Sequence, residues 1–80
     1  MNKLEFYDKV QEVNIPNEWF TLKGGLPNDK LCYSKEASIH QVYYSEKGQK
    51  FDVQVFNTEG EALNKLLQEL LKLKESYDKY

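Results

Sequence analysis

The sequence contains no arginine: lysine supplies all 11 basic residues, against 13 acidic ones, for a formal net charge of −2. Arginine makes the bidentate contacts to guanine and phosphate on which many nucleic-acid-binding proteins depend. Its absence and the negative charge argue against nucleic acid as the partner. The abundance of Lys, Asn, Tyr and Ile is also typical of AT-rich coding sequence, and this second explanation of the missing arginine carries more weight.

Cysteine occurs once, as Cys32. A single thiol forms neither an internal disulfide nor a cysteine-based zinc site, which fits a reducing cytoplasm. No stretch approaches the ~18 apolar residues of a membrane span, and residues 1–10 lack the apolar segment of a signal peptide. We therefore expect a cytoplasmic protein that does not insert into a membrane.

The short length limits what the chain can enclose. Its 80 residues are expected to form one domain, residues 1–80. A domain of this size buries only about two-thirds of its unfolded surface, which leaves little room for a substrate beside the core. We expect no enzymatic activity, no catalytic residue, no metal and no cofactor. Aromatic residues make up 14% of the chain, and Tyr and Trp are enriched in interfaces, so the composition favours a protein that binds another protein.

Hydrophobic periodicity predicts a helix near the start of the chain. Phe6, Val10 and Val13 follow the i, i+4, i+7 spacing of one helical face. We expect this helix to cover residues 3–13, because Pro16 disfavours helical geometry in the residue before it.

A second helix is predicted to begin after Thr58. The sequence Thr58-Glu59-Gly60-Glu61 is a capping box, in which the threonine hydroxyl accepts from the amide of Glu61. The expected apolar stripe of this helix consists of Leu63, Leu66, Leu67, Leu70, Leu73 and Tyr77.

Three segments between the helices are predicted to be strands, at residues 31–35, 39–46 and 51–55. The third alternates apolar and polar residues, which is typical of a half-buried strand. Because the segments are close in sequence, we expect them to form an antiparallel meander. The predicted fold class is therefore α+β: a single α-β-β-β-α domain with both helices packed on one face of a three-stranded sheet.

The candidate docking surface is the other face of this sheet. Tyr43 and Tyr44 are adjacent in a strand, so they point to opposite faces. If Tyr44 packs under the helices, Tyr43 lies on the open face. Trp19 either fills the core, the favoured interpretation, or is an exposed interface residue. The predicted partner-binding residues are Trp19, Asp29, Tyr43, Glu46 and Asp52.

Other patterns with known chemistry have simpler explanations. His40 is the only histidine and has no partner at metal-ligand spacing, so we expect a structural role at the edge of the sheet. The pair Gly24-Gly25 is not followed by the Gly-Lys-Ser/Thr pattern of a phosphate loop. Double-stranded RNA-binding domains share the α-β-β-β-α order, but they place lysines at the start of the last helix. Here TEGEALNK places two glutamates there.

Two segments carry a more specific pattern. They are IPNEWFTLKGGLPNDKLCY at residues 15–33 and VYYSEKGQKFDVQVFNTEGEA at residues 42–62. Together they give a proline-aromatic segment, a Gly-rich loop ending in Pro-Asn, a short strand, a VYYSE-x-G hairpin and a capped final helix. This pattern resembles the family of small bacterial toxin-immunity proteins known as immunity protein 59.

The resemblance implies a cytoplasmic bacterial protein that binds a cognate toxin domain and neutralises it by stoichiometric occlusion, so protecting the producing cell. It carries over no toxin-contacting residue, because the matching positions are turn glycines, aromatic residues of the core and a helix cap. If the toxin is basic, acidic residues such as Asp29, Glu46 and Asp52 supply complementary charge. The alternative is another small interaction or regulatory module, monomeric or weakly homodimeric through the free sheet edge or the Leu-rich helix.

Overall fold

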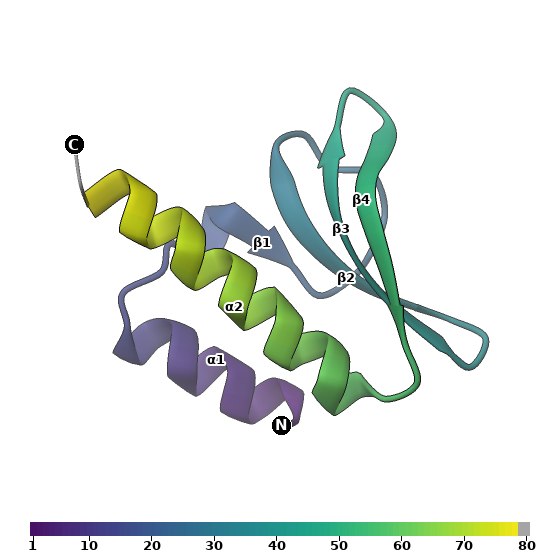
Figure 1. Cartoon of the computed structure of the whole chain (residues 1–80), viewed down its shortest axis with the longest axis horizontal. Coiled ribbons are helices and arrows are strands. Elements are labelled where there is room, and N and C mark those ends of the chain that lie inside the picture. The colour runs from purple at the N-terminus through teal and green to yellow at the C-terminus, as the bar shows by residue number, and fades with distance from the viewer. Residues whose placement is uncertain (79–80) are drawn as a thin grey trace.

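The computed structural model describes residues 1–78. In chain order its elements are α1 (Lys3–Glu12), the 3-10 helix η1 (Asn17–Trp19), β1 (Phe20–Thr21), β2 (Lys30–Glu36), β3 (Ile39–Glu46), β4 (Gln49–Phe56) and α2 (Glu59–Asp78). Figure 1 shows the two helices side by side, with the sheet next to them. The predicted α+β class is confirmed.

Both helices begin at side-chain caps. The Asn2 side chain accepts from the amide of Glu5 at 2.8 Å, and the Asn2 amide donates to the Glu5 carboxylate at 3.3 Å. At the start of α2, the Thr58 hydroxyl accepts from the amide of Glu61 at 3.2 Å and donates to the Glu61 carboxylate at 3.0 Å. Such caps satisfy backbone donors that the first turn leaves unpaired. The cap at Thr58 was predicted, whereas the cap at Asn2 was not.

The core lies between the helices and one face of the sheet. Its buried members are Phe6, Val10, Ile15, Phe20, Leu22, Tyr33, Val42, Ala62, Leu63, Leu66 and Leu70. Phe6 meets Phe20 edge-on, with ring centroids 5.3 Å apart, a favoured aromatic geometry. The predicted stripe of α2 is buried as far as Leu70, but Leu73 and Tyr77 are exposed. The last turns of α2 therefore extend beyond the core.

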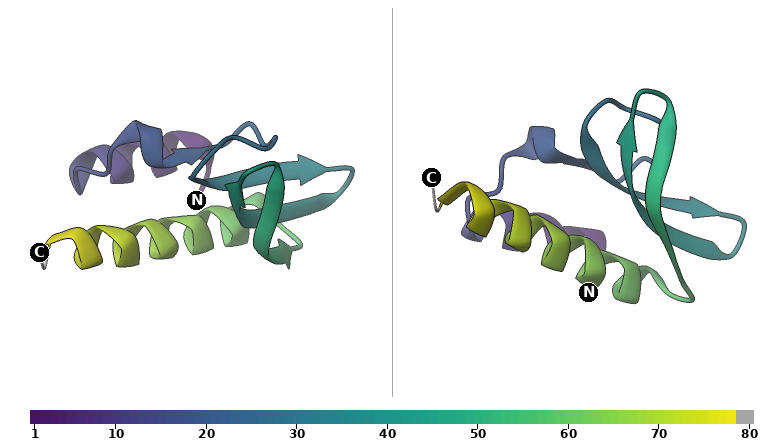
Figure 2. Two further views of the ribbon diagram at one scale, coloured as in Figure 1. Left: turned by 90° about the horizontal axis from the view of Figure 1, so that it is seen from above. Right: turned by 45° about the horizontal axis from the view of Figure 1, so that its top comes forward.

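The sheet has four strands in the order β1-β2-β3-β4. Strands β2, β3 and β4 form the predicted antiparallel meander. The expectation of only three strands is wrong, because β1 pairs with β2 in parallel, with Phe20 opposite Leu31 and Thr21 opposite Cys32. A strand of two residues is too short to show an alternating pattern. Figure 2 shows the β2–β3 hairpin extending past the N-terminal end of α2.

The loop at residues 22–29, called the glycine loop below, covers the face of the sheet opposite α2. Because β1 and β2 are parallel, the chain must return between them to the end at which it started. During this return the Gly24 amide donates to the carbonyl of Tyr33 at 3.0 Å, and the Gly25 carbonyl accepts from the Tyr43 hydroxyl at 2.7 Å. A Cβ on Gly24 would lie 2.9 Å from the Cβ of Ser34, and φ is +69°, so the close approach needs glycine.

The prediction that Tyr43 lies on an open face is therefore wrong. Alternation does place its side chain on the face away from the helices. However, the loop covers that part of the face, and Tyr43 is only 1% exposed. The expectation failed because a loop without regular structure gives no sequence signal of the surface on which it packs.

The pairing of β3 with β4 contains a bulge at Asp52. Tyr44 lies opposite Phe51, while Val42 lies opposite Gln54, so between these pairs β4 has one residue more than β3. Asp52 has φ +54°, in the left-handed region. Aspartate tolerates this conformation better than β-branched residues do.

The bulge changes which side chains of β4 face the core. Phe51 pairs with a residue on the helix side, whereas Val55 pairs with Gln41 on the opposite face. Val53 and Val55 are 46% and 59% exposed. The prediction that the apolar residues of this strand share one half-buried face is therefore wrong, because an inserted residue reverses the alternation.

Replacing Asp52 by valine is expected to lower the free energy of unfolding by about 1–2 kcal/mol, because a β-branched residue is disfavoured in the left-handed region. Asp52→Gly is expected to keep or raise stability, since glycine adopts this conformation without steric cost. Urea denaturation followed by circular dichroism measures both variants. Equal stability of the valine and glycine variants would contradict the strained bulge.

Candidate functional site

A groove of about 660 Å³ lies between the last turns of α2 and the segments that flank the glycine loop. This volume is within the range of about 300–1,000 Å³ typical of ligand sites. The apolar part of the lining consists of Trp19, Leu31, Tyr44, Leu73 and Tyr77. Because η1, β2, β3 and α2 each contribute at least one residue to it, the groove is lined by residues of four regular elements.

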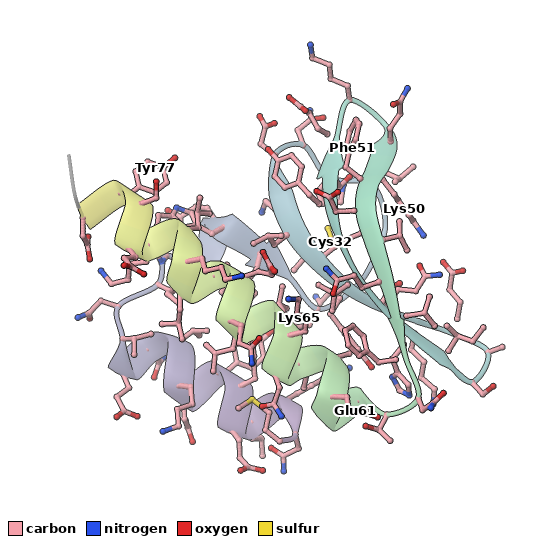
Figure 3. All side chains as sticks on the ribbon, in the orientation of Figure 1. Cys32, Lys50, Phe51, Glu61, Lys65 and Tyr77 are labelled. Carbon is pink, nitrogen blue, oxygen red and sulfur yellow. The ribbon has the colours of Figure 1, made fainter. Side chains whose placement is uncertain are left out.

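The rings of Trp19 and Tyr77 pack against each other at a tilt in the groove, which Tyr44 also lines. Their centroids are 5.1 Å apart and their planes are inclined by 32°. Trp19 belongs to η1, directly after Pro16, and Tyr77 lies near the C-terminal end of α2 (Figure 3). Trp19 is half-buried and packs against the core as well as lining the groove. The favoured interpretation, in which Trp19 packs on the core, agrees with the structure, whereas its role in an interface stays a prediction.

The polar part of the lining is mainly acidic, with Asp29, Glu69, Lys72 and Ser76. Asp29 accepts a hydrogen bond from the Tyr44 hydroxyl at 3.2 Å. Loss of hydration raises the pKa of Tyr44, and the hydrogen bond to Asp29 and the negative charge of that carboxylate raise it further. Glu69 forms an ion pair with Lys65 at 3.1 Å.

A separate buried cluster lies under the glycine loop, around Tyr43. The ammonium of Lys50 lies 4.5 Å from the centroid of the Tyr43 ring and donates to Gln41 at 3.1 Å and to Glu36 at 3.4 Å. Burial raises the pKa of the neighbouring Cys32 thiol to about 11, although the hydrogen bond with Tyr43 and nearby lysines oppose this shift. The thiol is therefore protonated at neutral pH and is a poor nucleophile.

His40 has a structural partner. Its Nδ1 lies 2.8 Å from the Tyr33 hydroxyl, and the two rings stack with centroids 6.0 Å apart. Within residues 1–78, no group of three or more His, Cys, Asp or Glu side chains is placed to hold a metal ion. No helix in the same part of the chain has the length and apolar character needed to cross a membrane.

The structure brings together only part of the predicted partner-binding set. Trp19 and Asp29 line the same groove. Tyr43 is buried under the glycine loop, Glu46 is half-buried at the end of β3, and Asp52 is exposed at the bulge. The predicted residues therefore do not form one surface.

The prediction missed the other residues that line the groove, among them Tyr44, Leu73 and Tyr77. Leu73 and Tyr77 continue the apolar stripe of α2 beyond the last buried leucine, Leu70. A helix whose apolar stripe is longer than the sheet can cover was the available signal. Tyr44 was expected under the helices, and the structure places it on that face, but nothing in the sequence indicated that its hydroxyl would reach Asp29 beside the groove.

No protein-family model, curated protein or solved structure matches this chain. The resemblance to immunity protein 59 therefore stays a prediction.

Truncation of Tyr43 and of Trp19 should lower the free energy of unfolding by different amounts. Tyr43→Ala is expected to cost about 3–5 kcal/mol of unfolding free energy, the usual range for a buried aromatic residue. Tyr43→Phe should cost about 1 kcal/mol, for the lost hydrogen bond to Gly25. Trp19→Ala should cost less than Tyr43→Ala, because its ring is half-exposed. Urea denaturation of the three variants tests this order, and a larger loss for Trp19→Ala would contradict it.

Proposed function

We propose that this chain is an immunity-type inhibitor, a cytoplasmic bacterial protein that binds a cognate toxin domain and neutralises it by stoichiometric occlusion. The observation that carries the proposal is the aromatic groove, since it is open to solvent and is lined by residues of four regular elements. The resemblance of residues 15–33 and 42–62 to immunity protein 59 supports it.

The groove suits a central binding site better than a whole interface. Stable protein–protein interfaces bury about 800 Å² on each partner. A few buried side chains near the centre, often Trp, Tyr and Arg, supply most of the binding energy. In this proposal Trp19 and Tyr77 form that centre, and the surrounding surface of α2 and the glycine loop excludes water.

Occlusion needs no catalytic group on the inhibitor, so we assign none. The groove is assembled before binding, because Trp19 is fixed by Tyr77 and Asp29 by the Tyr44 hydroxyl. Little ordering entropy is therefore lost when a partner binds, which favours a tight complex.

The proposal is tested by recovering the partner and measuring protection from it. Tagged protein is used to capture partners from its native host, and the terminal domain of each captured protein is then expressed alone and together with this chain. We expect one partner whose isolated domain stops growth, restored growth on co-expression, and a 1:1 complex. A partner that is harmless, or a toxic domain that this chain binds but does not inhibit, would overturn the inhibitor proposal.

Two matched variants locate the interface. Leu73→Glu places a charge in the groove, whereas Leu4→Glu makes the same change on α1 at a position 77% exposed. We expect the first to lose protection and the second to keep it, with both folded by circular dichroism. Equal protection by the two variants would place the interface elsewhere.

A second candidate function is self-association through β4. This strand is at the edge of the sheet, and Phe51, Val53 and Val55 are exposed on it. An exposed edge strand with apolar side chains is suited to pairing with another chain. A homodimeric interaction module is therefore the alternative.

Sedimentation over a wide range of protein concentration distinguishes the two candidates. Self-association predicts a dimer at high concentration that Val55→Lys abolishes, because the charge is placed on the exposed edge, while Leu4→Lys leaves it unchanged. A monomer at every concentration would remove this second candidate.

A further inference from the structure

We propose that the groove is a specific site for a basic side chain of the partner, with the carboxylates of Asp29 and Glu69 and the rings of Trp19 and Tyr77 as its recognition elements. This inference rests on the proposed function and deepens it, because it names the chemistry of the partner. An arginine fits best, since its planar guanidinium both pairs with carboxylates and stacks on aromatic rings.

Asp29 has capacity left for a cation. Its carboxylate accepts from the Tyr44 hydroxyl at 3.2 Å. Among residues 1–78, no lysine lies within ion-pair distance of it. An ionised carboxylate offers roughly four acceptor positions, so a guanidinium can bind alongside Tyr44.

The apolar lining suits the rest of an arginine side chain. A cation over the face of an aromatic ring gains about 0.5–2 kcal/mol, with tryptophan the best ring. The tilted rings of Trp19 and Tyr77 line the groove together with Leu31 and Leu73. The leucines can contact the aliphatic part of the arginine while its charged end reaches the carboxylates.

The charges that line the groove select against other occupants. An anion would meet the carboxylate of Asp29, which no lysine of residues 1–78 pairs with, and that of Glu69, which is paired with Lys65 at 3.1 Å, against the ammonium of Lys72. A purely apolar side chain would remove water from Asp29 without supplying a countercharge, which is unfavourable. Lys72 opposes a cation, but its exposed side chain is long and can turn towards solvent. The groove therefore favours a cation over an anion or an apolar group.

The protein contains a reporter for this site. Trp19 is the only tryptophan, so indole fluorescence comes from the groove alone. The probe is the peptide acetyl-Gly-Arg-Gly-amide, compared with the same peptide carrying citrulline, which has nearly the same shape and no charge. We expect the arginine peptide to cause a saturable change in Trp19 fluorescence, with a dissociation constant on the order of 1 mM. Binding of the citrulline peptide should be at least fivefold weaker.

A matched pair of variants tests the role of the carboxylate. Asp29→Asn keeps the side-chain shape and suits the left-handed backbone at this position, where φ is +57°. It should weaken binding of the arginine peptide at least fivefold. Asp8→Asn, an exposed residue of α1 outside the groove, should leave binding unchanged, and Lys72→Ala should strengthen it.

Equal binding of the two peptides, no saturable change, or an unchanged affinity of Asp29→Asn would overturn this inference. If it fails while the chain still protects cells from a toxin, the proposed function stands and only the chemistry of the groove is wrong. If the peptide binds but no toxic partner exists, the groove recognises basic side chains and the inhibitor proposal falls.

Discussion

The arrangement of this domain depends on the parallel pairing of β1 with β2. That pairing forces residues 22–29 to cross the sheet, where the Tyr43 hydroxyl holds the carbonyl of Gly25 at 2.7 Å. The crossing places η1 at one end of the loop and Asp29 at the other. Trp19 and Asp29 reach the same groove for this reason. The contact between the Tyr43 hydroxyl and the Gly25 carbonyl on one face of the sheet thus helps to position two residues of the groove.

Local patterns predicted the regular elements well. The predicted strand at residues 39–46 has the same bounds as β3, and the first helix ends within one residue of its expected end. The cap at Thr58 is present, since its hydroxyl accepts from the Glu61 amide, although the Glu61 carboxylate reaches back to that hydroxyl rather than to the Thr58 amide. These features are determined by side-chain spacing and by contacts over three or four residues, which a single sequence displays directly.

Apart from the unpredicted cap at Asn2, the failures concern contacts between separate segments of the chain. Nothing near Tyr43 in the sequence indicates that the carbonyl of a glycine 18 residues earlier accepts a hydrogen bond from its hydroxyl. The bulge at Asp52 reverses the alternation of β4, and the sequence there reads as a regular strand. The groove was found only in part, through Trp19 and Asp29, because the contact between the Tyr44 hydroxyl and Asp29 joins residues that are 15 positions apart in the sequence.

Helix α2 contributes to the core and to the groove with separate parts of its length. The part of the helix up to Leu70 contributes Leu63, Leu66 and Leu70 to the core, while Leu73 and Tyr77 lie beyond the core and line the groove. Substitutions in the last two turns therefore change the lining of the groove, which under the proposed function is the surface offered to a partner, and leave the buried leucines of the core in place. A lineage under pressure to follow a changing partner can vary those positions and keep the same scaffold. In this protein, evolvability follows from a helix that is longer than its core requires.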